Sequence, residues 1–299
     1  MSQTENHHHH EVSGKNLGLA ILLNVLITVA EAVGGFISGS MALLSDATHN
    51  LSDVISLFIS YIANKLAKRE ATEEQTFGLK RSEIFAAFLN SATLIVLSIF
   101  ILTEAIKRLF EQVNISASWV IYLALLSILV NGVSVLFIKG DAKKNINMKS
   151  AYLHLFSDML TSIAVLIGGL AMKYLQWIWV DSVFSIAIAI YLLYLSWDIL
   201  KTSLRIMMQF TPAGINIKQI VSELESIEGV KNIHHVHIWQ LSEHDKMFEA
   251  HTDLAQNISI SEFEDILAQM KAVLHRFEIT HLTIQPEYET ADSKEIIHK

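Results

Sequence analysis

Six apolar segments of membrane-spanning length dominate this chain of 299 residues and constrain its fold more than any other feature. Each is long enough to cross the hydrocarbon core of a bilayer, which takes about 20 residues of α-helix. With 52% hydrophobic and 17% charged residues, the chain is too apolar for an ordinary soluble domain. We therefore predict an α-helical membrane protein whose six-helix bundle comprises Leu17–Ile37, Ala42–Leu66, Ile84–Leu109, Trp119–Ile138, Ser150–Tyr174 and Ile178–Leu204.

The distribution of Lys and Arg predicts that both termini are cytoplasmic, because cytoplasmic loops are enriched in these residues. They concentrate after the second and the fourth predicted helices, at Lys65, Lys68, Arg69, Lys80, Arg81, Lys139, Lys143, Lys144 and Lys149. The polar segment 1–16 has no small-residue cleavage site, so we expect no cleavable signal peptide. Its four histidines, His7–His10, are either a native metal-gathering tail, which we favour, or the remnant of a tag.

A second domain begins near Thr211, where Pro212 and Gly214 end the sixth apolar segment. Its periodicity predicts the element order α-β-β-α-β, a small open-faced α+β domain of ferredoxin or metallochaperone type. The expected elements are a helix at Ile217–Ser226, strands at Val236–Leu241 and Met247–Leu254, a helix at Ser261–His275 capped by Ser261, and a strand at Thr280–Gln285. The predicted organisation is thus a tail at 1–16, a membrane domain at 17–210, a soluble domain at 211–290 and a second tail at 291–299.

The charge of the chain resides in the soluble domain. Residues 211–299 hold 15 acidic and 7 basic residues, which accounts for the whole net charge of −8. An acidic surface argues against nucleic acid and for cations, although solubility alone also explains it. The chain has no cysteine, so disulfides and thiolate metal sites are excluded and any metal is bound by nitrogen and oxygen.

Two His-x-x-x-Asp pairs, His49 with Asp53 and His154 with Asp158, lie inside apolar segments. Residues at i and i+4 share a helix face, so two such helices side by side would offer two nitrogens and two oxygens to one cation. Ionisable residues at the bilayer centre each cost about 2.5 to 3.5 kcal/mol on insertion scales, so the repeated pattern calls for a function. We predict a tetrahedral zinc site, because imidazole favours zinc-like metals over magnesium or calcium.

Such a site also binds protons. Histidine must be neutral to bind a metal, so protons compete with zinc and the same residues can alternate between a loaded and a protonated state. This is the chemical outline of an antiporter. Asp46, one turn before His49, either guides ions into the site or caps the second helix.

The motifs together resemble the cation diffusion facilitator zinc transporters. The resemblance is carried by GSMALLSDATHNLSD at Gly39–Asp53, FGLKRSE at Phe77–Glu83, the second His-x-x-x-Asp pair and the acidic C-terminal domain. It implies a homodimer in the lipid bilayer that exports Zn²⁺ from the cytoplasm in exchange for protons, and the sequence leaves open whether Cd²⁺ or Co²⁺ is also carried. The transport site would consist of His49, Asp53, His154 and Asp158.

The resemblance also implies regulatory zinc in the C-terminal domain, which would then be a metal-binding dimerisation domain. The candidate ligands are His234, His251, His281 and Glu287, and His235, His237 and His244 compete for the same role. Family members often carry histidine before the FG motif, where this chain has Glu73, Glu74 and Gln75. Some members also pair the residue equivalent to Arg81 with an acidic residue at the end of the sixth helix, where this chain has Met207, Met208 and Gln209. The first departure puts a loop metal site in doubt, and the second puts a gating ion pair of Arg81 in doubt. The long His-rich loop of eukaryotic members is absent, which indicates a bacterial inner-membrane protein.

Two other classes of protein compete with a transporter. An intramembrane metalloenzyme would need an open coordination position and a general base, yet the sequence has no HExxH motif and four ligands would saturate the metal. A membrane-anchored zinc sensor would need the soluble domain but not the two His-x-x-x-Asp pairs. We therefore expect a transporter and not an enzyme.

Overall fold

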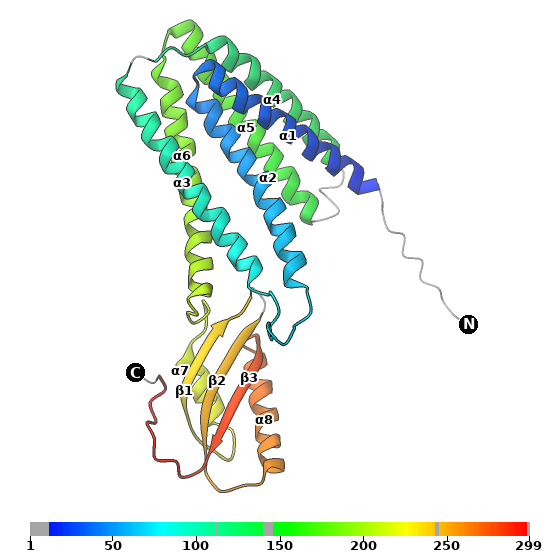
Figure 1. Ribbon diagram of the computed structural model, residues 1–299, viewed down its shortest axis with the longest axis vertical. Coiled ribbons are helices and arrows are strands. Elements are labelled where there is room, and N and C mark those ends of the chain that lie inside the picture. The colour runs from blue at the N-terminus through cyan, green and yellow to red at the C-terminus, as the bar shows by residue number, and fades with distance from the viewer. Residues whose placement is uncertain (1–11, 112, 140–145, 243–244, 298–299) are drawn as a thin grey trace, which may run out of the picture. The chain divides into compact units, whose positions relative to one another are not determined.

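A computed structural model describes residues 12–111, 113–139, 146–242 and 245–297 (Figure 1), and the side chains of residues 12–21, 57, 138, 146–151, 153 and 154 lie outside this description. The chain divides into two compact units. The first comprises Met1–Phe58 and Asn90–Asp198, and the second comprises Ile59–Leu89 and Ile199–Lys299. Each is described by itself below.

Six long helices confirm the predicted bundle. They are α1 (Val12–Ser38), α2 (Met41–Ala67), α3 (Ser82–Phe110), α4 (Ala117–Ile138), α5 (Ile146–Leu175) and α6 (Trp179–Met207). Among the described residues, α3 to α6 each contain a segment long and apolar enough to cross a membrane, and α1 contributes a shorter apolar stretch, Leu22–Ser38. α2 does not reach this level of apolarity, since it carries Asp46, His49 and Asp53.

The core of the first unit forms where α1 and α5 pack against α4. Val120, Leu123 and Ala124 of α4 are buried against Val165 and Met172 of α5 and against the start of α2. Glycine permits two close approaches of helices: a Cβ at Gly34 would lie 1.9 Å from Leu123, and one at Gly169 would lie 3.0 Å from Ile121. Small residues at such crossings bring backbones together and increase van der Waals contact, which drives helix association in membranes.

The N-terminus of α2 is held by a buried carboxylate from α6. Asp181 accepts hydrogen bonds from the backbone N–H groups of Met41 (2.8 Å) and Ala42 (3.4 Å) and from the Ser40 hydroxyl. Ser40 in turn accepts from the backbone N–H of Leu43, as an N-cap residue does. These groups satisfy helix-terminal donors that water cannot reach, so the position of α2 in the bundle is fixed at this end.

The second unit contains the predicted α-β-β-α-β domain. Its elements are α7 (Ile217–Glu225), β1 (Val230–Gln240), β2 (Lys246–Leu254), α8 (Ile260–His275) and β3 (Ile279–Glu287). The sheet order is β1-β2-β3, with β1 antiparallel and β3 parallel to β2. Both helices lie on one face of the sheet (Figure 1), and their apolar sides enclose a core with Ile220, Leu224, Phe248, Met270 and Leu274.

Several boundaries differ from the sequence prediction, and two of the differences have a clear structural cause. The cap of α8 is Ser259, not Ser261: its hydroxyl accepts from the Glu262 backbone N–H while the Glu262 carboxylate accepts from the Ser259 backbone, a capping box. β1 begins at Val230, six residues before the predicted start. The alternation of apolar residues is broken there, because a β-bulge interrupts the ladder between His234 and His237.

The bulge moves alternate side chains of β1 from one face of the sheet to the other. Ile233, before the bulge, and Val236 and Ile238, after it, all belong to the core under the helices. An unbroken strand would place residues of odd and even number on opposite faces. His234 therefore lies on the face away from the helices, opposite His251 of β2. At the bulge, His235 adopts the left-handed backbone conformation, with φ of 51°.

Candidate functional site

The polar face of α2 brings four candidate groups together. Asp46, His49, Asn50 and Asp53 recur at helical spacing, and Nδ1 of His49 lies 3.7 Å from Oδ2 of Asp53. The side chains of His49 and Asp53 are 20% and 29% exposed, so neither is enclosed. Asp46 is fully buried inside α2, well after its first residue, so Asp46 does not cap the helix.

A buried polar network joins this face to α1, α4 and α5. The Asn50 amide donates to Oε2 of Glu31 at 3.3 Å, and Ser127 of α4 lies near the same carboxyl group. The hydroxyls of Ser127 and Ser162 are 2.8 Å apart, and Ser162 donates to the backbone carbonyl of Asp158 at 2.9 Å. The network therefore connects all four helices at the level of Asp158.

Three carboxyl groups from three helices lie near one another in this region. Glu31, Asp46 and Asp158 are each at most 2% exposed. Like charges in a low-dielectric interior repel strongly unless a cation or protons neutralise them. The arrangement thus favours the presence of a cation or of bound protons.

The other predicted residues of the membrane domain lie as follows. His154 is in α5, one turn before Asp158, but its side chain lies outside the described ones. Arg81 is exposed. Its neighbour Lys80 forms an ion pair with Asp245 at 3.0 Å, within the second unit.

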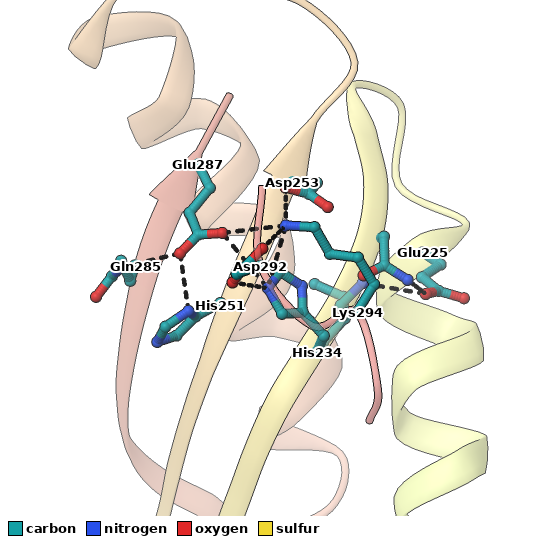
Figure 2. A network of polar contacts seen from close by, with 10 residues as sticks. Glu225, His234, His251, Asp253, Gln285, Glu287, Asp292 and Lys294 are labelled. Carbon is teal, nitrogen blue, oxygen red and sulfur yellow. Dashed lines mark hydrogen bonds and ion pairs between the residues drawn. The ribbon is translucent and has the colours of Figure 1, made fainter. Parts of the chain in front are cut away.

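A second candidate site lies on the face of the sheet away from α7 and α8. His234, His251, Glu287 and Asp292 each offer a ligand atom, and these atoms all lie within 4.8 Å of one another. Nε2 of His234 is 3.4 Å from Oε2 of Glu287 and 3.2 Å from Oδ2 of Asp292, and Nδ1 of His251 is 2.8 Å from Oε1 of Glu287. Figure 2 shows the four side chains converging from β1, β2, β3 and the segment after β3.

The spacing of this cluster fits zinc. Tetrahedral zinc with bonds of about 2.0 to 2.2 Å separates its ligand atoms by about 3.3 to 3.6 Å. The His234 contacts with Glu287 and Asp292 are close to this separation already. His234 is fully buried, and its Nδ1 has no hydrogen-bond partner among the described residues, so the ring is held by packing with Nε2 directed at the carboxylates.

The structure brings three of the four predicted regulatory residues together and leaves His281 apart. His281 is exposed and is paired in register with Met247, whereas Glu287 is paired with Asp253. His281 and Glu287 are six positions apart along β3, which corresponds to a distance of about 20 Å at about 3.3 Å per residue. Among the competing histidines, His235 stacks on His251 with ring centroids 4.7 Å apart, and His237 contacts His235 edge to face. His244 lies outside the described residues.

Sequence reasoning missed Glu31 and Asp292. Glu31 was recognisable as an acidic residue in mid-span, but its contacts with Asn50 and Ser127 depend on how three helices pack. Asp292 follows the last strand and reaches His234 because the chain turns back across the sheet. No local pattern in the sequence signals that turn.

A helical bundle that buries acidic side chains at mid-span, joined to a domain with a histidine and carboxylate cluster, defines a membrane protein that handles cations. Comparison with known proteins agrees with this class. Residues 17–208 match the cation efflux transmembrane domain, and residues 212–289 match the cytoplasmic domain of cation efflux proteins. The chain belongs to the cation efflux, or cation diffusion facilitator, family of zinc transporters, and it is a transporter and not an enzyme.

Curated bacterial relatives match over nearly their whole length. The chain is 37% identical to a cadmium, cobalt and zinc/H(+)-K(+) antiporter of Bacillus subtilis, over 95% of this chain and 92% of the relative. It is 32% identical to the metal cation efflux system protein CzcD of Cupriavidus metallidurans, over 96% and 90% of the two chains. It is also 32% identical to the zinc transporter ZitB of Escherichia coli, over 96% and 92%.

Proposed function

We propose that this protein exports Zn²⁺ from the cytoplasm in exchange for protons, through a transport site formed by His49 and Asp53 of α2 and His154 and Asp158 of α5. The observation that carries the proposal is that the buried carboxyl groups of Asp46 and Asp158 lie near each other, because this relates the polar face of α2 to the second His-x-x-x-Asp pair. Two imidazoles and two carboxylates form a neutral complex with Zn²⁺, and this donor set favours zinc over the hard cations Mg²⁺ and Ca²⁺.

The surroundings of this site suit a transported ion better than a structural one. Structural zinc sites are closed, whereas His49 and Asp53 are both partly exposed. The further carboxyl groups of Glu31 and Asp46 are buried in the same bundle, and their ionisation as a cation enters would attract that cation. Asp46 is therefore the residue we propose to guide ions to the site.

Protons supply the second half of the exchange. Zinc binds neutral imidazole and ionised carboxylate, so a proton that binds either group competes with the metal. Protonation from the far side of the membrane would release zinc, and loss of those protons on the cytoplasmic side would restore the empty site. The four ligands then alternate between zinc and protons without a separate proton carrier.

The assembly we propose is a homodimer in a bacterial inner membrane, with both termini cytoplasmic. The match of residues 212–289 to a family of domains named for dimerisation supports the dimer, and the Lys and Arg residues of the loops support the orientation. The antiporter of Bacillus subtilis named for cadmium, cobalt and zinc supports Cd²⁺ and Co²⁺ as further substrates.

The cluster of His234, His251, Glu287 and Asp292 would hold a regulatory zinc ion in the cytoplasmic domain. Its buried imidazole and its carboxylates supply the nitrogen and oxygen ligands that zinc accepts. Bound zinc would supply positive charge to an acidic domain. His281, which the sequence also predicted as a ligand, lies too far away to join this cluster in the observed fold. It could bind the same ion only from another position of β3 or from the partner subunit of a dimer.

Sealed vesicles containing the purified protein test this function. A transporter raises zinc inside the vesicles, and an opposed proton gradient accelerates the flux. A membrane-anchored sensor binds zinc without moving it. Zinc that stays outside under every gradient would therefore exclude the proposed transport, even if the protein binds zinc tightly.

A further inference from the structure

The C-terminal segment of residues 288–297, hereafter the tail, lies along the edge of the sheet at the bulge of β1. The backbone N–H groups of His235 and Val236 donate to the carbonyls of Glu295 (3.2 Å) and Ile296 (2.8 Å). β1 is an edge strand, and exposed strand edges recruit further backbone in this way. Ile296 packs against the core of the domain, so the tail is held by apolar contact as well.

The tail places one ammonium group inside the cluster of candidate zinc ligands. Nζ of Lys294 is 2.9 Å from Oδ1 of Asp253, 3.3 Å from Oε2 of Glu287 and 3.5 Å from Nε2 of His234, and it also contacts Asp292. Figure 2 shows Lys294 among these groups. Three of the four ligands that zinc would need are therefore in contact with a lysine of the same chain.

This contact joins opposite charges. A lysine ammonium is charged at neutral pH, and Nζ of Lys294 lies against the carboxylates of Asp253, Glu287 and Asp292. At neutral pH, the cluster thus contains a full positive charge supplied by the tail.

We propose that Lys294 is an internal cation of the cytoplasmic metal site, and that zinc binds there by displacing the lysine ammonium. The inference rests on the proposed regulatory site. Zinc requires the same lone pairs of Glu287 and His234 at about 2.0 to 2.2 Å, a position that the ammonium nitrogen blocks from 3.3 and 3.5 Å. Two cations that share one carboxylate oxygen would also repel each other, so occupation by zinc and by lysine is mutually exclusive.

This competition would set the zinc concentration at which the domain responds. The zinc-free domain leaves neither Glu287 nor Asp253 unpaired, because both carboxylates form an ion pair with the Lys294 ammonium. Only the molecules in which Lys294 is displaced can bind zinc. The apparent zinc affinity is therefore the intrinsic affinity of the site multiplied by the fraction of such molecules. Asp292 can remain as a ligand, and the movement is then confined to residues 294–297.

Calorimetry on the full chain tests the competition. Deletion of His7–His10 together with Asp53→Ala and Asp158→Asn serves as the background, because it removes the metal-gathering histidines and the proposed transport site and leaves the cytoplasmic site as the one measured. Lys294→Met in this background should tighten zinc binding about tenfold. Lys271→Met removes the same charge from the exposed surface of α8 and should change the affinity less than about twofold.

A second comparison separates competition from general charge. Asp253→Asn removes an anion near the site, which weakens zinc binding, and also removes a partner of Lys294, which strengthens it. In the Lys294→Met background only the weakening remains. The affinity lost on Asp253→Asn should therefore be larger in that background, a non-additivity that reports on a shared contact.

Tail movement provides a readout that does not depend on affinity. The chain has no cysteine, so Glu295→Cys gives a single site for a spin label, and Gln269→Cys on α8 gives the control. Zinc should increase the mobility of the label at 295 and leave that at 269 unchanged. Equal zinc affinities of the Lys294→Met and parent proteins, together with an immobile tail label, would overturn the inference while the regulatory site stands. Absence of zinc binding in both proteins would overturn the regulatory site and the inference with it.

Discussion

At the scale of single residues, the chemistry depends on carboxylates that the fold keeps close together. Asp158 is almost fully buried, and the buried carboxyl groups of Glu31 and Asp46 lie near it. The Asn50 amide donates a hydrogen bond to Glu31 from another helix, which helps to fix the position of this acid. The membrane domain thus contains more acidic groups near the proposed site than two His-x-x-x-Asp pairs supply.

Removal of one proposed transport ligand should abolish transport. Replacing partners that merely orient metal ligands typically costs about 10-fold to 100-fold in affinity or activity, so loss of a ligand itself should cost at least about 100-fold. We expect Asp53→Ala, His154→Ala and Asp158→Asn each to reduce zinc uptake in vesicles to background. Asp198→Asn, which changes an exposed carboxylate of α6, is the matched control and should transport normally. Normal uptake by any of the three variants would remove that residue from the site.

His49→Asp should broaden the range of transported metals. Replacing an imidazole with a carboxylate weakens the preference for zinc-like ions and favours harder ions such as Mn²⁺. Competition of Mn²⁺ and Cd²⁺ with zinc uptake measures the change, with His237→Asp in the cytoplasmic domain as a control for the added charge. An unchanged order of preference would mean that His49 does not select the metal.

At the scale of elements, caps and bulges decide details that periodicity does not show. The apolar segments predicted all six long helices, because a bilayer requires each span to be about 20 residues long. The strands were predicted less well, since the bulge at His234 hides the first half of β1. Asp292 and Lys294 were not predictable as site residues, because their contacts arise from the return of the tail across the sheet and not from a local pattern.

The capping box of α8 predicts a pH-dependent stability. The Ser259 backbone and hydroxyl both donate to Glu262, and these hydrogen bonds lower the pKa of Glu262 below its ordinary value of 4.5. A carboxylate with a lowered folded-state pKa contributes stability above its unfolded-state pKa and loses it as the pH falls through the folded-state value. Glu262→Ala should therefore lower the melting temperature of the fragment Thr211–Lys299 at pH 7, and the difference should shrink as the pH falls below 4.5. Glu264→Ala, two residues further along α8 and without this contact, is the control. A loss of melting temperature on Glu262→Ala that is as large at acidic pH as at pH 7 would contradict the assignment.

At the scale of the whole molecule, we propose that the membrane domain passes the ion and that the cytoplasmic domain senses zinc. The cytoplasmic domain has a core of its own, formed by α7, α8 and the sheet, so we expect the fragment Thr211–Lys299 to fold alone. It carries a formal charge of −8, which opposes contact between two copies. Salt screens this repulsion beyond about 8 Å at physiological ionic strength, but not at contact.

Zinc should therefore compact a dimer of this fragment. Divalent ions held by the cluster around His234 neutralise part of the charge and favour the closed pair in proportion to their extra affinity for it. X-ray scattering should show a smaller radius of gyration at saturating zinc. His251→Ala should weaken the effect, whereas His281→Ala should not if the cluster of the structure is the site. Zinc binding without compaction would leave the domain as a plain dimerisation module.

The central claim is that zinc and protons exchange at one site, and simultaneous measurement of both ions in sealed vesicles tests it most directly. With a zinc indicator and a pH indicator trapped inside, an inward zinc gradient should produce zinc uptake and proton release from the vesicles with the same time course. The Asp158→Asn variant should abolish both signals together. Zinc uptake without proton movement, or proton movement that persists in the variant, would contradict exchange at this site.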